Sequence, residues 1–564
     1  MLKNECFIFI RFKNELLLHM RNFTSPLEAF QYWEQQDPDA YLFKQPFNGV
    51  LKTYTYKQAG HEVRQIAAKL KSFDLAPGSH VALLSKNCAH WVMSDLAIML
   101  AGYVSIPIYP TLNEKSINQI LTHSEARAII VGKLDDYNSQ KSGIPSMPII
   151  SVDAYGLKDG YVWEDIIEGN ESVELPKFDL EQLHTIIYTS GTTGKPKGVM
   201  HSLGNFMYSS SKLISLLDLP NQPRLFSYLP LAHVAERLIM TNGLILGAEI
   251  SYPESLETFA KNLEDCQPNM FFGVPRIWTK FQEKILEKLP QGKLDFLLKL
   301  PIISSIIKTK LKKKLGLMSS RFNCSAAAPI SPSLIKWYNT IGVDIYQGYG
   351  MTEDCCVSHF NLKGQNKVGT VGKTIDEVEV RLSDEGEICI KNKSLMLGYF
   401  KSPVLTSAAF DSQGYLKTGD IGEFDEDGYL TITGRIKDQF KTDKGKYISP
   451  APIEVEFEKN TDIEQICIVG TGLPHPIALI TLSELARQKS NDELELSLLQ
   501  TLETINPKFE RHEHVARIIV MKDDWNVENG LTTPTLKVKR SEIEKLYSKY
   551  YSEWYNSDNQ VLFE

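Results

Sequence analysis

The chain has 564 residues, of which 43% are hydrophobic and 23% are charged. This length exceeds what one hydrophobic core usually serves, so we expect a globular protein with at least two domains. The formal net charge of −8 argues against nucleic acid as a partner, because a general nucleic-acid-binding protein needs a basic face.

The N-terminal residues and the cysteines bear on the compartment. The apolar run at residues 6–10 is cut short by Arg11, which makes it too short for a secretory signal. We therefore expect residues 1–20 to be an extension, or the product of a start codon placed upstream of the true start at Met20. The eight cysteines are scattered without a C-x-x-C pair, which predicts a reducing, cytoplasmic setting. No run of about 18 uncharged apolar residues occurs, so no transmembrane helix is predicted.

Helices and strands alternate from residue 23 onward, which predicts an α/β fold with a mostly parallel sheet covered by helices. The expected helices are residues 56–73 and 90–102, and the expected strands are residues 80–85, 104–109, 126–132 and 184–190. Strands at 377–382 and 386–392 can pair, and residues 411–434 are predicted to form a β-rich end, so that the large domain includes a β-rich subdomain. We assign residues 21–434 to one large N-terminal domain.

Residues 435–564 are predicted to form a small mobile α+β domain. The expected strands are residues 464–470, 477–483 and 515–521, and the expected helices are residues 491–505 and 541–550. Ser490 or Asn491 is the expected cap of the first helix.

A loop rich in glycine and hydroxyl groups follows the strand at 184–190. Residues 188–200 read YTSGTTGKPKGVM, and the residues expected to bind phosphate are Thr189, Ser190, Gly191, Thr192, Thr193, Gly194, Lys195 and Lys197. Glycines allow close backbone approach to an anion, hydroxyl and amide groups donate hydrogen bonds, and lysines neutralise charge. A P-loop does not fit, because Pro196 follows Lys195 where that motif needs a hydroxyl residue. A loop without a ligand is the other alternative, and two lysines in this setting argue against it.

This segment resembles the signature loop of the adenylate-forming (AMP-binding) superfamily, which includes acyl-CoA synthetases, luciferases and peptide-synthetase adenylation domains. The resemblance implies that residues 189–197 close over the β- and γ-phosphates of ATP.

Further segments match the superfamily in the same order. Residues 325–330 (SAAAPI) resemble the segment beside the adenine, with Ala327 and Ala328 where many members have glycine. In residues 346–353 (YQGYGMTE), the resemblance places Tyr349 against the adenine, Thr352 near the α-phosphate and Glu353 as a Mg²⁺ ligand. An aromatic ring can stack on a base, and a hard cation prefers carboxylate oxygen.

The resemblance extends through the C-terminal part. It implies that Asp420 holds the ribose hydroxyls, that Arg435 adds a ribose or phosphate contact, and that Lys437 is the hinge of the small domain. Lys537, in residues 529–540 (NGLTTPTLKVKR), aligns with the lysine that reaches the forming acyl-phosphate. Lys539 and Arg540 follow closely, so a slip of register and a plain basic strand stay as alternatives.

Four segments indicate which branch of the superfamily this is. Residues 226–238, 271–281, 435–448 and 529–540 together resemble long-chain fatty acyl-CoA synthetases. The resemblance implies ATP, Mg²⁺, coenzyme A and a long-chain fatty acid, with an acyl-adenylate formed first and acyl-CoA as product. A ligase that delivers to a carrier protein, and an inactive nucleotide-binding scaffold, remain alternatives.

Several side chains in these segments allow two interpretations. His233 occupies the position of a gate near the acyl and coenzyme A channels, or is a satisfied core histidine. Glu236 and Arg237 can form an ion pair on a helix, and Trp278 either borders an acyl tunnel or only packs.

A basic segment runs from Leu298 to Leu317 (LKLPIISSIIKTKLKKKLGL). It is apolar first and then rich in lysine, which is typical of a segment that lies on an anionic membrane, here the inner face. A solvated basic helix is the equal alternative. The oligomeric state stays open, with a homodimer among the options.

Overall fold

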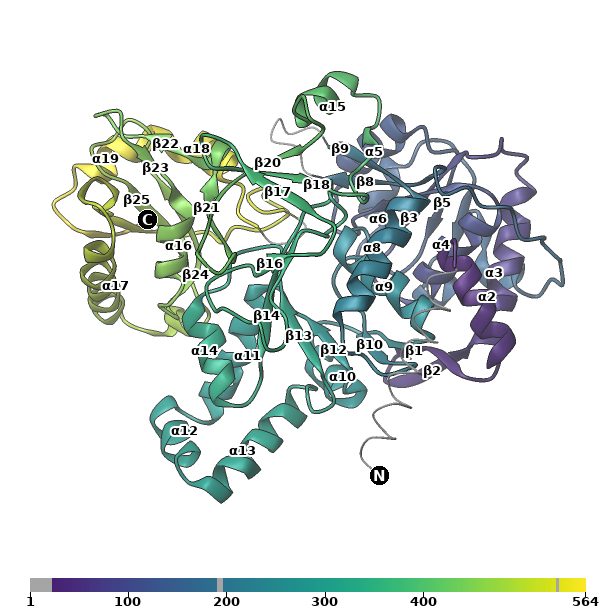
Figure 1. Cartoon of the computed structure of the whole chain (residues 1–564), viewed down its shortest axis with the longest axis horizontal. Helices are drawn as coiled ribbons and strands as arrows, with labels where there is room; N and C mark the ends of the chain where they lie inside the picture. The colour runs from purple at the N-terminus through teal and green to yellow at the C-terminus, as the bar shows by residue number, and fades with distance from the viewer. Residues whose placement is uncertain (1–22, 190–195, 534–536) are drawn as a thin grey trace.

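The computed structural model describes residues 23–189, 196–533 and 537–564. Its sheets are flanked by helices in a large N-terminal body, and a smaller C-terminal unit lies at one end of the molecule (Figure 1). This is the predicted α/β fold class with a β-rich region and a C-terminal α+β unit. No described helix has both the length and the apolar character needed to cross a bilayer.

An eight-stranded sheet forms the centre of the N-terminal half, in the order β19-β9-β8-β4-β3-β5-β6-β7. Its strands are β3 (His80–Leu84), β4 (Val104–Ile108), β5 (Ala128–Val131), β6 (Ile149–Ser151), β7 (Tyr161–Val162), β8 (Leu183–Thr189), β9 (Lys197–Ser202) and β19 (Gly398–Tyr399). The strands from β8 to β7 are parallel, whereas β9 and β19 are added antiparallel. Parallel strands need helical crossovers, which is what the alternating sequence predicts.

Both faces of this sheet are buried, as the apolar strand sequences require. Val81 and Leu83 point into the core shared with α3 and α4, whereas Ala82 and Leu84 point into the core shared with α5. The helices on and around the sheet are α2 (Pro26–Gln36), α3 (Tyr56–Lys71), α4 (Ala89–Leu100), α5 (Glu114–Ser124), α6 (Tyr137–Gln140), α7 (Trp163–Ile166), α8 (Leu203–Leu216) and α9 (Val234–Leu246).

Three further sheets complete the large body. The first, in the order β10-β11-β1-β2, contains β1 (Tyr41–Phe47), β2 (Val50–Thr55), β10 (Arg224–Phe226) and β11 (Glu249–Ser251). The second runs in chain order through β12 (Met270–Phe272), β13 (Phe322–Ser325), β14 (Ile345–Tyr349), β15 (His359–Phe360) and β16 (Lys373–Thr374). The third, in the order β17-β18-β20-β21, contains β17 (Glu379–Leu382), β18 (Glu387–Lys391), β20 (Leu416–Phe424) and β21 (Leu430–Arg435). The predicted pairing of the strands near 379 and 387 is confirmed.

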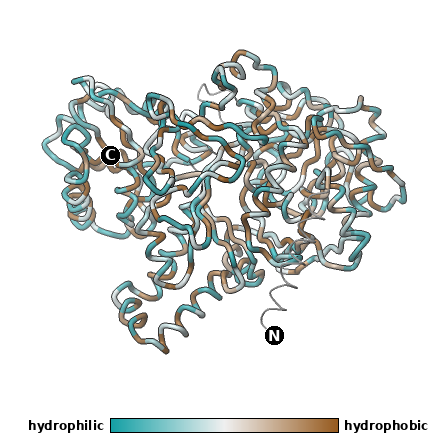
Figure 2. Tube along the Cα trace, in the orientation of Figure 1, coloured by the Kyte–Doolittle hydropathy of each residue, from teal (hydrophilic) through white to brown (hydrophobic). Residues whose placement is uncertain are grey.

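The helices of this second half of the body are α10 (Phe259–Cys266), α11 (Pro275–Lys288), α12 (Gln291–Leu298), α13 (Pro301–Lys314), α14 (Pro332–Thr340) and α15 (Pro403–Ala409). Helices α12 and α13 form a hairpin that projects from the body (Figure 1). Along the hairpin, hydrophobic and hydrophilic residues alternate (Figure 2).

The C-terminal unit is built on a four-stranded sheet, β24 (Ile463–Val469), β25 (Ile477–Leu482), β26 (Ile518–Val520) and β27 (Val561–Phe563), in chain order. A two-stranded ribbon, β22 (Phe440–Lys441) and β23 (Tyr447–Ile448), and helices α16 (Pro450–Phe457), α17 (Asn491–Ile505), α18 (Arg540–Tyr547) and α19 (Tyr551–Tyr555) complete it. Ile466 and Ile468 face one apolar cluster and Cys467 and Val469 face another, and both clusters draw only on residues after 439. The boundary at 434/435 itself stays a prediction.

Most predicted elements agree with the structure within a few residues. Ser490, one of the two expected caps, accepts a hydrogen bond from the Glu493 backbone and forms a capping box before α17. The strand expected at 515–521 is shorter, Ile518–Val520, and β27 was not predicted because three residues show no periodicity.

Candidate functional site

The predicted site residues gather where strands from different sheets end. Tyr349 ends β14, and Asp420 in β20 lies opposite Arg435, the last residue of β21. Thr189 ends β8 and directly precedes residues 190–195, which lie outside the described residues. Ligands commonly bind at the carboxyl ends of parallel strands, where loops from neighbouring strands converge.

Tyr349, Asp420 and Arg435 form a hydrogen-bonded group. The Tyr349 hydroxyl donates to Asp420 Oδ2 over 2.6 Å, and Arg435 Nε donates to Asp420 Oδ1 over 2.6 Å. Asp420 is buried, whereas more than half of the Arg435 side chain is exposed. Burial and the neighbouring Asp420 charge raise the pKa of Tyr349 far above its ordinary value, so the hydroxyl keeps its proton. The resemblance assigned these three residues to one nucleotide site. In the structure, their hydrogen bonds hold the Asp420 carboxylate in a fixed orientation beside the ring of Tyr349.

The alanine segment adopts the backbone that glycine usually provides. Ala327, just after β13, has φ of 72°, in the left-handed region that side chains disfavour. Ala328 is outside that region. Ala327 therefore holds a backbone conformation that glycine would adopt without this strain.

Replacing Ala327 by glycine is expected to stabilise the protein by up to about 1 kcal/mol, because the left-handed strain disappears and outweighs the added freedom of the unfolded chain. Thermal unfolding of the ligand-free protein measures it. The matched control, Ala328→Gly, gains only unfolded-state freedom and should lower stability by about 0.5–1 kcal/mol. Equal shifts in the two variants would contradict the assigned strain.

A second group links Lys197, Tyr399 and Glu353. The Tyr399 hydroxyl donates to Glu353 Oε1 over 2.8 Å, and Lys197 Nζ lies 4.9 Å from the centre of the Tyr399 ring. Tyr399 reaches this position because β19 pairs with β9, the strand that Lys197 begins. Sequence reasoning did not identify Tyr399. Strand β19 has only two residues and lies nearly 200 residues from its partner β9, so it gives no local signal.

The turn that holds Thr352 and Glu353 is fixed by its neighbours. His201, buried in β9, hydrogen-bonds the Thr352 carbonyl over 2.8 Å through Nε2. Asp354 accepts backbone hydrogen bonds from Met351 and Cys356, and its burial raises its pKa to about 7. Sequence reasoning identified neither His201 nor Asp354, which act here on the backbone.

The amino group of Lys537, a residue of the C-terminal unit, is under the electrostatic influence of Arg435 and Asp420. Removal from water and, to a smaller extent, the positive charge of Arg435 together lower the pKa of this amino group to about 8, and the charge of Asp420 opposes both. Lys537 is exposed as a whole residue, so the removal from water applies to the amino group at the end of its side chain. Arg540 is committed elsewhere, since it pairs with Glu454 and donates to the Ile468 carbonyl. The geometry therefore favours Lys537 over Arg540 for the predicted role.

His233 is also under the electrostatic influence of Lys537. Its Nδ1 accepts a hydrogen bond from the Ala235 backbone over 3.2 Å, which caps α9 and leaves the proton on Nε2. Burial, with a smaller effect of the Lys537 charge, lowers the pKa of His233 to about 4, so the ring is neutral near pH 7. The histidine is therefore a helix cap at the site, and its role as a gate stays a prediction.

The expected Glu236–Arg237 ion pair is wrong. Glu236 instead accepts a hydrogen bond from Ser227 over 2.6 Å, and its burial raises its pKa to about 8. Arg237 pairs with Asp95 over 2.7 Å, between the rings of Trp91 and Phe206. Adjacent helical residues point in different directions, which is why they found different partners.

Trp278 packs in the core. It is completely buried and donates from Nε1 to the Gly273 carbonyl over 2.9 Å. Its ring meets Phe271 and Tyr338 edge to face, which agrees with the packing alternative.

An ionic contact joins the large body to the C-terminal unit. Glu464 at the start of β24 pairs with Arg276 and with Lys280, the latter over 3.1 Å, both from α11. Although burial alone would lower it, the Glu464 charge raises the pKa of Lys280. This contact stabilises the arrangement in which Lys537 lies at the site.

Replacing Glu464 by glutamine should slow any step that needs Lys537 in place by up to about 30-fold, because each of its two partly exposed pairs contributes up to about 1 kcal/mol. The step that follows domain rotation should not slow. Asp524→Asn, which breaks an exposed pair with Arg487 within the C-terminal unit, is the control. The ratio of the two half-reaction rates is the measurement, and the same ratio in both variants would exclude this role for the contact.

Parts of the predicted site lie outside the described residues or apart from it. Ser190, Gly191, Thr192, Thr193, Gly194 and Lys195 lie outside the described residues, as does the predicted extension at residues 1–20. Lys437 lies in an exposed helical turn, Ile436–Asp438, directly after β21. Its function as a hinge stays a prediction.

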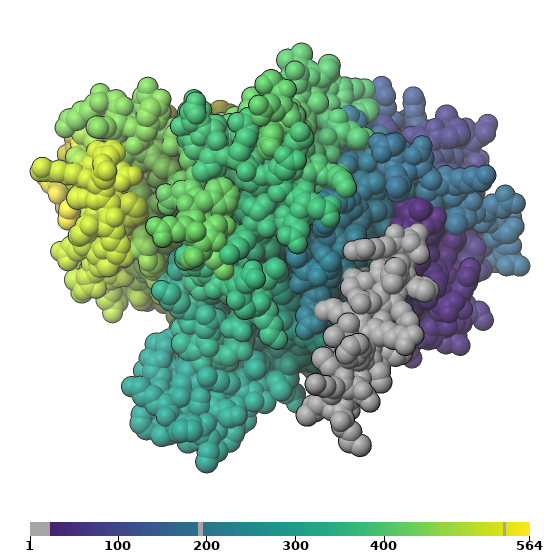
Figure 3. Space-filling model, in the orientation of Figure 1, coloured from purple at the N-terminus to yellow at the C-terminus, as the bar shows by residue number. Residues whose placement is uncertain are grey.

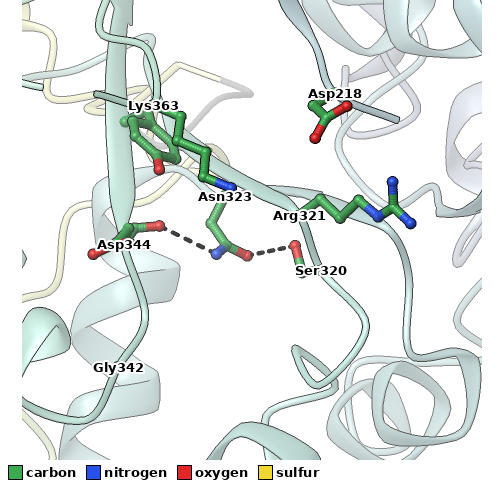
Figure 4. A pocket seen from close by; sticks show the side chains of 8 residues that line it. Asp218, Ser320, Arg321, Asn323, Gly342, Asp344 and Lys363 are labelled. Atoms are coloured by element: carbon green, nitrogen blue, oxygen red, sulfur yellow. Dashed lines mark hydrogen bonds between the residues drawn. The ribbon is translucent and has the colours of Figure 1, made fainter. Parts of the chain in front are cut away.

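A polar hollow lies at the opposite edge of the second sheet. Arg321 precedes β13 and Asp344 precedes β14, so the hollow is at the amino ends of strands whose carboxyl ends approach Tyr349. Figure 4 shows Asn323 between the Asp344 carbonyl, at 3.1 Å, and the Ser320 hydroxyl, at 2.8 Å. Acidic and basic side chains both line it, and we assign it no ligand.

The site and fold together define a two-part nucleotide-binding enzyme class, with a buried carboxylate beside a tyrosine and a lysine supplied by a separate C-terminal unit. The AMP-binding enzyme family matches residues 30–400, and the AMP-binding enzyme C-terminal domain family matches residues 437–559. The chain belongs to the AMP-binding enzyme family.

Curated relatives match along most of the chain. Long-chain-fatty-acid–CoA ligase FadD15 of Mycobacterium bovis is 27% identical, covering 92% of this chain and 96% of its own length. Human long-chain-fatty-acid–CoA ligase 1 is 28% identical, covering 89% of this chain and 82% of its own length.

Solved structures share the fold. The anthranilate CoA ligase AuaEII, solved with anthranoyl-AMP, aligns with a TM-score of 0.78 at 21% identity, covering 94% of this chain and 98% of that one. The A domain of carboxylic acid reductase from Segniliparus rugosus aligns with a TM-score of 0.79 at 19% identity, covering 96% of each chain.

Proposed function

We propose that the protein is an ATP-dependent long-chain fatty acid–CoA ligase of the cytoplasm. The observation that supports this most is the approach of Lys537 to the Tyr349–Asp420–Arg435 group, because a site that only bound nucleotide would have no use for a lysine from a second unit. The names of the full-length relatives support the fatty acid and coenzyme A.

The first half-reaction forms an acyl-adenylate. A carboxylate oxygen of the fatty acid attacks the α-phosphorus of ATP in line, the α–β bridging bond breaks, and pyrophosphate leaves with the bonding electrons. Tyr349 stacks on the adenine, Ala327 and Ala328 border it, and Asp420 and Arg435 bind the ribose. Thr352 and Lys537 stabilise charge on the reacting oxygens, and residues 189–197 hold the pyrophosphate. Positioning and charge neutralisation suffice without a protein nucleophile.

Glu353 is suited to bind Mg²⁺ together with the phosphates of ATP. One of its oxygens is oriented by Tyr399, and no cluster of three or more metal-binding side chains occurs among the described residues. Mg²⁺ usually takes only one or two carboxylates and completes its shell with phosphate and water, so this donor set fits. The ion would neutralise phosphate charge.

The second half-reaction needs a different arrangement. The C-terminal unit turns about Lys437, withdraws Lys537, and presents the side that contains Lys444 and Lys446 to coenzyme A. The thiol then attacks the acyl carbonyl, and AMP leaves. One mobile unit thereby lets a single site serve two reactions in sequence. His233 would act as a gate near the acyl and coenzyme A channels.

Product analysis tests the proposal directly. The purified protein with ATP, coenzyme A and a series of fatty acids should yield AMP, pyrophosphate and acyl-CoA, with long chains preferred because each buried methylene contributes about 0.8 kcal/mol. Formation of ADP would exclude it. Thioester on an acyl carrier protein but not on coenzyme A would support the carrier-delivering alternative, and no fatty-acid-dependent pyrophosphate exchange into ATP would support the scaffold.

A further inference from the structure

The α12–α13 hairpin has an exposed apolar end. Five of its residues are exposed and apolar where the two helices join, and we call them the hairpin tip: Phe296, Leu300, Ile302, Ile303 and Ile306. Ile302 is 79% exposed, Phe296 62% and Ile306 50%. Contiguous exposed apolar groups usually mark a contact surface, whereas single ones do not.

The two ends opposite the tip are anchored to the body. The Trp337 indole of α14 donates to Gln291 at the start of α12 over 2.9 Å. At the other base, Gln267 donates to the Lys313 carbonyl over 2.8 Å, and Lys314 pairs with Glu264 of α10 over 2.9 Å. The junction of the helices is therefore the part that extends outward, as a lobe in Figure 3.

Charge on the hairpin differs sharply from that of the whole chain. Residues 291–314 contain seven lysines and one acidic residue, in a chain of net charge −8. In the part of the chain that the structure describes, ion pairs engage only Lys314 of these seven. Lys293, Lys299, Lys310 and Lys313 are exposed to solvent, so an anionic partner is favoured.

The lysines of α13 lie farther from the hairpin tip than its isoleucines do. Along α13, Lys310 and Lys313 follow Ile306 by about 6 Å and about 10 Å of helix rise. Amphipathic helices bury their apolar groups about 5–10 Å deep at the boundary of head groups and acyl chains. Immersing the tip to that depth therefore brings the lysines to the level of the phosphate groups.

We propose that the α12–α13 hairpin docks on an anionic lipid bilayer, with the hairpin tip among the acyl chains and the lysines on lipid phosphates. The benefit of the contact rests on the proposed function, because a long-chain fatty acid partitions into bilayers and would be collected there. The contact itself is tested separately from catalysis.

Co-sedimentation with vesicles tests the docking. The full-length protein should bind phosphatidylcholine vesicles that contain phosphatidylglycerol, bind pure phosphatidylcholine weakly, and dissociate as salt rises. Ile302→Glu combined with Ile306→Glu should weaken binding about 10-fold or more, and Lys310→Glu combined with Lys313→Glu about 30-fold or more. Leu256→Glu, at an apolar residue 85% exposed on another part of the surface, should bind as the wild type.

Fatty-acid-dependent pyrophosphate exchange with soluble octanoate separates this inference from the proposed function. The hairpin variants should keep wild-type exchange, since the altered side chains are exposed and lie on helices outside the proposed site. Equal wild-type binding to neutral and anionic vesicles, or wild-type binding by the Ile302→Glu/Ile306→Glu variant, overturns the proposal. The proposal is also overturned if the wild type does not bind vesicles and the Ile302→Glu/Ile306→Glu variant has a different oligomeric mass. That result would assign the hairpin tip to contact with a second copy of the chain.

Discussion

Replacing Lys537 by methionine is expected to slow acyl-adenylate formation by about 10²–10³-fold, the usual cost of removing one preorganised charge-stabilising group. Transfer from supplied acyl-adenylate to coenzyme A should stay near the wild-type rate, because the lysine has left the site in that half-reaction. Pyrophosphate exchange measures the first step, and acyl-CoA formation from synthetic acyl-adenylate measures the second.

Lys539→Met is the matched control for this experiment. Lys539 lies two residues away on the same segment and has no described ion pair, so its loss should leave both half-reactions near wild type. Equal loss of both half-reactions in the Lys537 variant would exclude the assigned role. A larger loss in the Lys539 variant would show that the register is shifted by two residues.

The sequence predicted those parts of the fold whose signal is local. Periodic apolar residues identified α3 and the strands of the parallel sheet, because burial on both sides of β3 demands continuous apolar residues. The cap of α17 was narrowed to Ser490 or Asn491, and the structure shows Ser490, because a capping residue acts within one turn. Motif order likewise identified Tyr349, Asp420 and Arg435 before any geometry.

The contacts that sequence reasoning missed join distant residues. Tyr399 meets Glu353 through a two-residue strand, and Glu464 meets Arg276 across 188 positions. Glu236 and Arg237 were predicted to pair with each other because they are adjacent in the sequence. Their actual partners, Ser227 and Asp95, lie on other segments of the chain. Such pairings depend on how whole elements pack, which the local residue pattern does not show, even for Ser227 and Glu236 nine positions apart.

The electrostatic link between Asp420 and Lys537 leads to the second large effect. Asp420→Asn should weaken ATP binding by about 10²-fold, because a charged acceptor for the ribose hydroxyls is lost. The Asp420 charge also raises the pKa of Lys537, whose amino group titrates near 8 in the free protein. Removing that charge should lower the lysine pKa further.

The pH dependence of adenylation shows this second consequence. If protonated Lys537 is the active form, kcat/KM for ATP falls as pH rises through about 8, since kcat/KM reports groups of the free enzyme. In Asp420→Asn the fall should begin at lower pH. Tyr349→Phe removes a hydrogen bond to the same carboxylate but keeps its charge, so it should weaken ATP binding and leave the alkaline limb in place. An unmoved limb in Asp420→Asn would mean that another group controls it, and the proximity of Lys537 to the ribose site would then have no part in the chemistry.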